Sequence, residues 1–181
     1  MPLATRTVPR QRLHTRSIRY EGWLREDGLF DIEAHLVDTK DQDYPLASGV
    51  RPAGAPVHEM RARLTIDRHL GIRAIETSID GMPYPGGCDS TGPDYGALVG
   101  ANLMHDFRRR LFELVGGVRG CTHLTELIAF LPTAALQTLA GLVRDVEPDG
   151  PKPFQLGRCH ALATGTETVR RYYPKWYRGA A

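Results

Sequence analysis

Residues 17–38 read SIRYEGWL-REDG-LFDIEAHLVD, and this stretch decides the first half of the fold. Two β-like segments, 17–24 and 29–38, flank the dipeptide Asp27-Gly28, which is a common signal for a tight hairpin turn. In the second segment every other residue is apolar, as expected of a strand with one buried face: Phe30, Ile32, Ala34 and Leu36. The pattern predicts an antiparallel β-hairpin.

A second hairpin is predicted further along the chain. The segments VHEMRARLTID (57–67) and LGIRAIETSID (70–80) have strand-like composition, and the first alternates apolar with basic side chains. The segment between the hairpins, 41–56, is rich in Pro, Gly and Ala and is typical of a surface loop. Residues 81–96 are predicted to form a second Pro- and Gly-rich loop.

Helical spacing of apolar residues replaces the strand pattern in the second half. It predicts one helix over 94–115, ended by two glycines, and another from about 122 to 143. Pro132 should kink or split the second helix. Strands followed by helices indicate the α+β class, with an antiparallel sheet of two hairpins packed against long helices. We expect residues 1–13 to be a flexible arm and 14–181 to form a single α+β domain.

Composition excludes several classes of protein. The 181 residues are 41% hydrophobic, with no apolar run long enough to cross a bilayer, and the formal net charge of +2 does not suggest a nucleic-acid partner. Of 23 basic residues only three are lysine. Three cysteines without an apolar leader segment do not describe a secreted disulfide framework, so we expect a cytoplasmic protein. The common phosphate-loop, dinucleotide, serine-hydrolase and zincin motifs are absent.

Metal-binding residue types stand at junctions between the predicted elements. His58 begins the second hairpin, and Cys88 lies in the loop after it. Cys121 and His123 stand at the start of the second helix. Two imidazoles and two thiolates suit Zn²⁺ or Fe²⁺. These positions predict a mononuclear metal site formed by His58, Cys88, Cys121 and His123.

The same residue types also have a purely structural interpretation. Free cysteines are often core residues, and a single histidine is usually structural or exposed. Without a CxxC pair, the spacing leaves both interpretations open. Cys159, next to His160, could replace Cys121 as a ligand. The favoured prediction is instead that Cys159 is buried in the last element.

Charged and aromatic residues supply candidates for the remaining chemistry. Arg16 or Arg25 could bind a substrate carboxylate or phosphate through two hydrogen bonds. Asp27 or Glu59 could move protons, and Tyr84, held between two prolines, could form the wall of a pocket. On the residues alone, a salt-bridged strand surface is the favoured interpretation of the charged residues.

Several motifs together resemble a bacterial family catalogued as domain of unknown function 2889. They occur in order from about residue 13 to residue 177: HTR (14–16), REDG (25–28), DTK (38–40), VHEM (57–60), RLTID (63–67), PYPGGC (83–88), GCTHL (120–124), CHAL (159–162) and YYP (172–174). The resemblance implies membership but no activity.

The order of elements is more distantly similar to the SufE/NifU-like sulfur-transfer and iron–sulfur scaffold fold. That resemblance implies that His58 replaces the first scaffold cysteine, Cys88 matches the second, and Cys121 with His123 form the closing pair. A histidine in place of a thiolate disfavours an iron–sulfur cluster and suits a mononuclear metal with an open position.

These observations support three functional hypotheses. The first is a metal-dependent enzyme, a lyase or hydrolase, that acts on a small anionic organic substrate through Zn²⁺ or Fe²⁺. The second is an iron–sulfur or sulfur-transfer scaffold without turnover, and the third is an interaction domain whose cysteines are core residues. A homodimer is also considered, and neither nucleic acid nor membrane is expected as a partner.

Overall fold

The structure, a computed structural model, describes residues 3–142 and 150–179. The chain divides into two compact units, Met1–Thr138 and Leu139–Ala181. The single domain expected over 14–181 stays a prediction. Residues 3–13 form neither helix nor strand and are exposed along their whole length.

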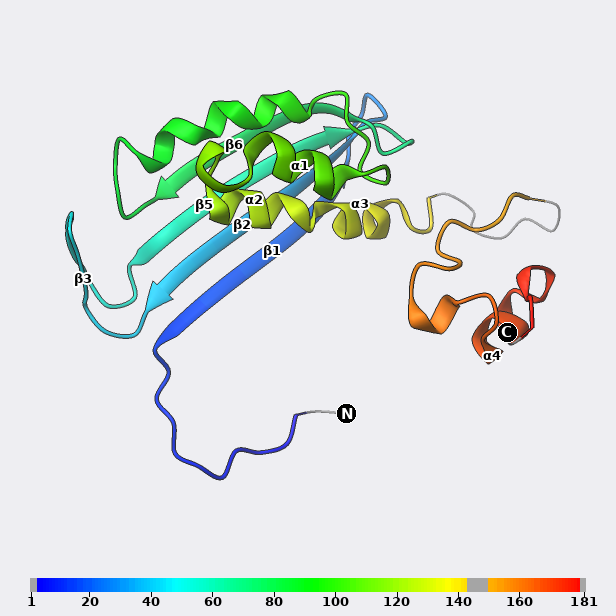
Figure 1. The fold of residues 1–181 in the computed structure, drawn as a ribbon, viewed down its shortest axis with the longest axis horizontal. Helices are drawn as coiled ribbons and strands as arrows, with labels where there is room; N and C mark the ends of the chain where they lie inside the picture. Colours follow the sequence, from blue (N-terminus) through cyan, green and yellow to red (C-terminus); the bar gives the residue numbers. More distant parts are fainter. Residues whose placement is uncertain (1–2, 143–149, 180–181) are drawn as a thin grey trace. The chain divides into compact units, whose positions relative to one another are not determined.

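A four-stranded antiparallel sheet is the frame of the first unit (Figure 1). Its strands are β1 (His14–Leu24), β2 (Phe30–Lys40), β5 (Pro56–Ile66) and β6 (Ile72–Gly81), in the spatial order β1-β2-β5-β6. Both predicted hairpins are confirmed: β1 pairs with β2, β5 pairs with β6, and β2 joins the two hairpins by pairing with β5.

The turn at Asp27-Gly28 fixes the register of the first hairpin. The N–H of Gly28 donates to the carbonyl of Arg25, and Gly28 adopts a left-handed φ of 79°, which glycine reaches without steric cost. The pairing then runs without interruption from Leu24 opposite Phe30 to His14 opposite Lys40. This register decides which side chains of β1 and β2 face each other near the candidate site.

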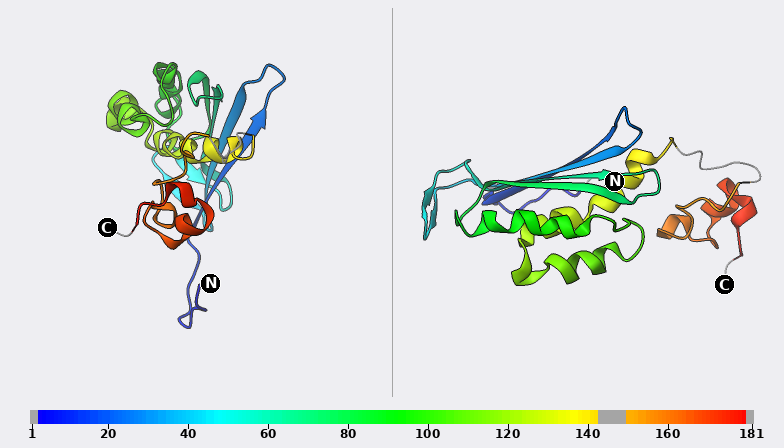
Figure 2. Two further views of the ribbon diagram at one scale, coloured as in Figure 1. Left: turned by 90° about the vertical axis from the view of Figure 1, so that its right-hand side faces the viewer. Right: turned by 90° about the horizontal axis from the view of Figure 1, so that it is seen from above.

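The helices of the first unit, within its described residues, lie on one face of this sheet (Figure 2). They are the 3₁₀ helix η1 (Cys88–Leu98) and the α-helices α1 (Phe107–Val115), α2 (Thr122–Ala129) and α3 (Leu131–Leu139), with the short 3₁₀ turn η2 (Gly117–Arg119) before α2. The core lies between the two layers, where side chains of β2 and β5 such as Leu36, Met60 and Leu64 are fully buried. Apolar residues on one side of each strand therefore explain the two-layer α+β arrangement.

The helices are shorter than the sequence predicted. The expected helix over 94–115 is wrong in its first half, where η1 ends at Leu98 and α1 begins only at Phe107. Gly100 and Asp106 both have left-handed φ angles, which an α-helix does not accommodate, and they interrupt it. Pro132 splits the second predicted helix into α2 and α3, as expected, and Gly141, with a φ of 85°, follows the end of α3.

The predicted surface loop over 41–56 contains a small hairpin of its own. Its strands are β3 (Tyr44–Leu46) and β4 (Gly49–Arg51), and they form a separate two-stranded sheet. Ser48 and Arg51 donate hydrogen bonds to the carbonyls of Pro83 and Met82 in the loop after β6. The prediction missed these strands because three residues are too few to show a periodicity.

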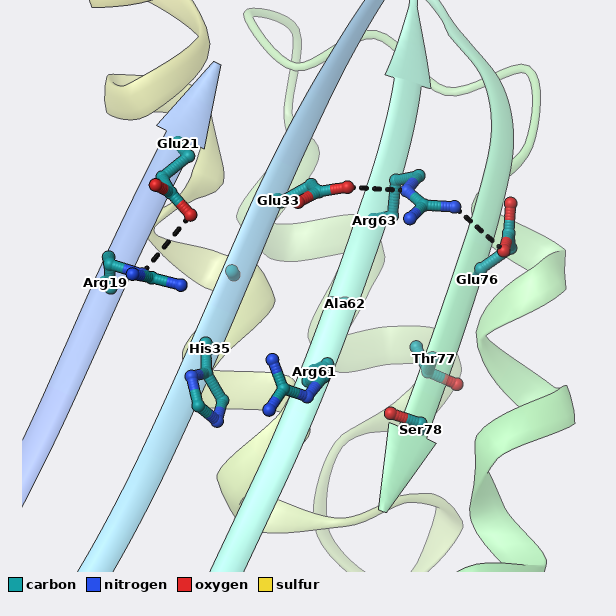
Figure 3. Close-up of a pocket in the computed structure, with 11 residues that line it drawn as sticks. Arg19, Glu21, Glu33, His35, Arg61, Ala62, Arg63, Glu76, Thr77 and Ser78 are labelled. Carbon is teal, nitrogen blue, oxygen red and sulfur yellow. Dashed lines mark hydrogen bonds and ion pairs between the residues drawn. The ribbon is translucent and has the colours of Figure 1, made fainter. Parts of the chain in front are cut away.

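Charged side chains line the second face of the main sheet, the face away from the helices of the first unit (Figure 3). Ion pairs join neighbours across it: Arg19 with Glu21 on β1, and Arg63 on β5 with Glu33 on one side and Glu76 on the other. These side chains edge a shallow depression of about 260 Å³. This surface is called the open face below.

The elements described within the second unit, over 150–179, are short. They are η3 (His160–Leu162), α4 (Glu167–Tyr172) and η4 (Pro174–Trp176). Thr166 caps α4 by accepting a hydrogen bond from the N–H of Val169, whose side chain is buried. Cys159 is exposed, so its predicted burial is wrong, because it precedes a short turn rather than packing inside a longer element. Among the described residues, no helix is both long and apolar enough to cross a bilayer.

Gly22 on β1 offers a test of the packing between sheet and helices. A Cβ at this position would overlap the side chain of Thr138 in α3. We expect Gly22→Ala to lower the free energy of unfolding by about 1–3 kcal/mol, because the β-branched threonine cannot move aside without shifting α3. Gly96→Ala is the matched control, since its Cβ would meet nothing within 4 Å. Equal urea midpoints for the two variants would contradict this packing.

Candidate functional site

A buried carboxylate lies at the end of β2. The alternation of buried residues along β2 continues past Leu36 to Asp38, which therefore points to the side covered by helices and is 3% exposed. An ionised carboxylate in such a place needs charged or hydrogen-bonding partners, because burial removes its water. Asp38 has four nearby partners, from three other elements of the fold.

Arg16 is the main partner of Asp38. The register of the hairpin places the two residues opposite each other. Arg16 donates from Nε to Oδ1 and from Nη2 to Oδ2, both at 2.8 Å, which is the paired geometry that guanidinium and carboxylate groups favour. The remaining nitrogen, Nη1, lies 3.5 Å from the carboxylate of Glu126 in α2. Arg16 thus links β1, β2 and α2.

Three histidines complete the surroundings of Asp38. His14 Nε2 lies 2.8 Å from Oδ1, and His58 Nδ1, on the neighbouring strand β5, lies 3.1 Å from Oδ2. His123 Nε2, on α2, lies 3.9 Å from Oδ2. The rings of His58 and His123 stack, with centroids 3.8 Å apart and planes at 29°. We call these five residues, Asp38, His14, Arg16, His58 and His123, the Asp38 cluster.

The cluster shifts the titration of its own members. Burial alone would raise the pKa of Asp38, but hydrogen bonds from Arg16 and His14 outweigh it and hold that pKa well below its usual range. Burial lowers the pKa of His58, and the neighbouring His123 lowers it further. Burial and the charge of Arg16 lower the pKa of His123. Near neutral pH, both stacked imidazoles are therefore held in the unprotonated form.

Tyr95 positions the start of α2 next to the cluster. Its ring is fully buried, and its hydroxyl donates to the carbonyl of Cys121 at 3.0 Å while accepting from the N–H of Cys121 at 3.1 Å. The same oxygen lies 2.9 Å from the hydroxyl of Thr125. The thiol of Cys121 lies 3.8 Å from the sulfur of Met60, two residues along β5 from His58. The tyrosine thus fixes the backbone that carries Cys121 and His123.

The donor atoms of the cluster suit a metal ion. Within the described residues, Asp38, His58 and His123 form a group whose ligand atoms lie within 4.8 Å of one another. A tetrahedral zinc ion with bonds of roughly 2.1 Å holds its ligand atoms about 3.4 Å apart, so small side-chain rotations would suffice. Unprotonated imidazole is also the form that binds a metal.

The predicted metal ligands are only partly brought together. His58 and His123 stack on each other, and Cys121 lies two residues before His123, at the amino end of α2. Cys88 begins η1 and does not belong to the group of close ligand atoms. Cys159 and His160 belong to the second unit.

The other predicted site residues are dispersed. Arg25 pairs with Asp27 and Asp31 at the turn of the first hairpin, at the opposite end of β1 from Arg16, about 30 Å along the strand. Glu59 lies on the open face and bonds His35 and Arg61. The structure therefore does not place Arg25, Asp27 or Glu59 beside the Asp38 cluster.

Tyr84 is exposed, at 54%, in the loop after β6. Its carbonyl accepts hydrogen bonds from the N–H groups of Gly87 and Cys88, and this turn leads into η1. The described contact between Tyr84 and Cys88 is therefore a hydrogen bond between their backbones.

Sequence reasoning did not single out Asp38 or His14, although both could have been found. Extending the alternation of Phe30 to Leu36 by one step places Asp38 on the apolar face, where a lone carboxylate is unfavourable. Counting outward from the turn then places Arg16 opposite Asp38 and His14 two residues further on. No comparable sequence signal showed that α2 contributes a residue to the cluster, because that contribution depends on how the helix packs against the sheet.

Comparison with known families gives one match. The profile of the family described as protein of unknown function (DUF2889) matches residues 14–137, and the chain belongs to this family. The match ends almost where the first compact unit ends, so it includes every member of the Asp38 cluster. No curated protein and no solved structure matches the chain, so nothing supports the expected SufE/NifU-like similarity.

Removing the charge of Asp38 should destabilise the protein. Asp38→Asn keeps the shape of the side chain but removes the paired carboxylate of Arg16 and leaves it only the longer contact with Glu126, and we expect a loss on the order of 2–3 kcal/mol in unfolding free energy. Glu33→Gln on the same strand is the control, because its pair with Arg63 lies on the open face and such pairs contribute about 0–1 kcal/mol. Urea denaturation at neutral pH measures both, and similar losses would contradict the assignment.

The lowered pKa values of His58 and His123 predict a pH dependence of stability. A histidine whose pKa is lower in the folded state binds protons more readily when unfolded, so the free energy of unfolding should fall as the pH drops from about 7 to about 5. His123→Asn should reduce this slope. His105→Asn, at an exposed position before α1, should leave it unchanged. An unaltered slope in His123→Asn would contradict the prediction.

Proposed function

We propose that the chain binds one transition-metal ion, Zn²⁺ or Fe²⁺, at His58 and His123 and acts through it on a small anionic organic substrate. One observation carries the proposal: two imidazoles from different elements lie side by side against a buried, ionised carboxylate. Burial of both rings favours the unprotonated form that a metal requires.

Asp38 fits the role of an orienting partner better than that of a primary ligand. Its two oxygens already accept hydrogen bonds from Arg16, His14 and His58. The contact with His58 is made by Nδ1, which leaves Nε2 of that ring as the nitrogen able to bind the ion. A carboxylate that holds the second nitrogen of a metal-bound histidine fixes its tautomer and strengthens its donor atom.

Cys121 is the third ligand in this proposal. Its thiol lies beside Met60 at the amino end of α2, close in sequence to His123 and close in space to the strand that carries His58. A cysteine thiolate is a ligand that both Zn²⁺ and Fe²⁺ accept. Cys88 stays a predicted fourth ligand and does not belong to the group of close ligand atoms formed by Asp38, His58 and His123. A set of three protein ligands would leave a coordination position for substrate or water.

The charge of the site favours an anionic substrate. Asp38 and Arg16 neutralise each other and the two stacked histidines are uncharged, so a divalent ion bound together with the thiolate of Cys121 would keep one net positive charge. Such an ion polarises a substrate oxygen or activates water. Arg16 is held by Asp38 and Glu126, and its contact with a substrate stays a prediction. Substrate contacts by Arg25 or Tyr84 and proton transfer by Asp27 or Glu59 also stay predictions. The choice between lyase and hydrolase is equally a prediction.

A metal-free acid–base site is the second candidate. The hydrogen bond from His58 to Asp38 orients an imidazole whose lowered pKa keeps it unprotonated and able to accept a proton. The iron–sulfur or sulfur-transfer scaffold has less support, because such clusters prefer several thiolates and the close ligand atoms in the described residues come from two histidines and an aspartate. Self-association and a cytoplasmic location stay predictions.

Metal analysis of the purified chain tests the proposal. The chain is incubated with Zn²⁺, or with Fe²⁺ under anaerobic conditions, and excess metal is removed. We then expect one ion per chain by inductively coupled plasma mass spectrometry. His58→Ala and His123→Ala should each weaken binding by at least tenfold, and Asp38→Asn by about 10- to 100-fold through loss of orientation.

Two controls make the experiment specific. His35→Ala removes a histidine from the open face, where it bonds Glu59, and should bind metal like the wild type. Comparing Cys121→Ser with Cys88→Ser decides which thiol contributes a ligand. Absence of a stoichiometric ion in the wild type, or an equal loss in His35→Ala, would reject the metal site. A wild type without a stoichiometric ion, in which the imidazole of His58 still takes up and releases a proton, would favour the acid–base candidate.

A further inference from the structure

The outer edge of β1 is open in the described structure. The main sheet has two edge strands, β1 and β6, and η1 packs along β6. On β1, only the side that faces β2 has backbone pairing. An unpaired strand edge presents a row of N–H and C=O groups that can pair with another chain.

β1 also lacks several features that protect an edge strand, although it carries the charged residues Arg16, Arg19 and Glu21. Proteins block such edges with short strands, bulges, prolines or lysines. β1 is 11 residues long, contains neither proline nor lysine, and pairs with β2 in a continuous register. The other two pairings, of β2 with β5 and of β5 with β6, both contain irregularities. In the main sheet the pairing of continuous register thus belongs to the edge strand β1.

Large apolar side chains are exposed along the same strand. Ile18, Trp23 and Leu24 are 45%, 53% and 62% exposed. Ile18 and Leu24 alternate with the open-face residues, whereas Trp23 lies in the same alternating set as Arg19 and Glu21 (Figure 3). An edge of this length with apolar residues on both faces is expected to be covered in solution.

We propose that β1 pairs with β1 of a second copy, antiparallel, about a two-fold axis at Tyr20. Pairing a strand with its own copy is isologous, so residues facing each other must belong to the same alternating set. Centring the axis on Tyr20 satisfies this requirement and pairs residues 16–24 of each copy. The result is one continuous eight-stranded sheet.

Charge complementarity selects this register. With the axis at Tyr20, Arg19 lies opposite Glu21 of the partner subunit, and Glu21 lies opposite Arg19 of the partner subunit. An axis one residue earlier would place two arginines opposite each other, and one residue later would place two glutamates opposite each other. Opposite charges across a strand pair are favourable and like charges are unfavourable.

The neighbouring positions in this register are compatible with pairing. Arg19 already forms an ion pair with Glu21 of its own strand at 3.2 Å, so the pairing creates a ring of four alternating charges on the open face. Trp23 would face Ser17 of the partner subunit, a small residue that leaves room for the indole. On the helix-covered side, Ile18 would face Gly22 of the partner subunit.

A charge-swap experiment tests the register directly. We expect the wild type to be a dimer in sedimentation equilibrium. Arg19→Glu and Glu21→Arg, made singly, should each weaken dimerisation by roughly tenfold or more, since each change places two like-charged pairs in the interface. The double variant R19E/E21R should regain wild-type dimerisation, because the opposite pairing is restored.

Mixing the single variants provides an independent readout. An R19E chain carries two glutamates and an E21R chain two arginines, so the two should form a heterodimer although neither dimerises well alone. Circular dichroism confirms that each variant is folded. A wild-type monomer at roughly 100 µM, single variants that dimerise like the wild type, or no recovery in the double variant and the mixture would each overturn the proposal.

Discussion

The paired hydrogen bonds between Arg16 and Asp38 are the constraint on which the rest of the site depends. They allow an ionised carboxylate to lie under the helices, at a position that the strand alternation would otherwise reserve for an apolar residue. Once Asp38 is charged and buried, its remaining hydrogen-bonding capacity attracts His14 and His58, and α2 brings His123 against them. The stability of the hairpin and the chemistry of the site are therefore coupled through one side chain.

The two faces of the sheet use charge in different ways. On the open face, arginine and glutamate form a series of exposed ion pairs, and each of these contacts contributes little to stability. On the helix-covered face the carboxylate of Asp38 is buried and pairs with Arg16, whose side chain is 34% exposed, and the burial of the carboxylate makes its contacts stronger and their loss more costly. A reactive centre is better supported by the second arrangement, because its geometry is fixed.

The sheet was predictable because its signals are local. Alternation in β2 and the Asp27-Gly28 turn were enough for the first hairpin, and its register follows from the turn. The first helix was overextended because apolar spacing continued across Gly100 and Asp106, whose backbone angles break the helix. The sequence pointed to His58 and His123, but their stacking depends on the docking of α2, and the importance of Asp38 appears only when the register is counted. Non-local packing was the missing information.

The members of the Asp38 cluster come from distant parts of the chain, with more than 100 residues between His14 and His123. Contacts between such distant segments form slowly and late, because the entropy of closing a long loop is lost before the contacts contribute stabilising free energy. When the sheet has formed from its two hairpins, His58 and Asp38 are already in contact. His123 joins them only when α2 packs against the sheet. The stacked histidine pair is thus a marker of completed folding, and any ligand that requires both rings binds the finished tertiary structure in preference to its precursors.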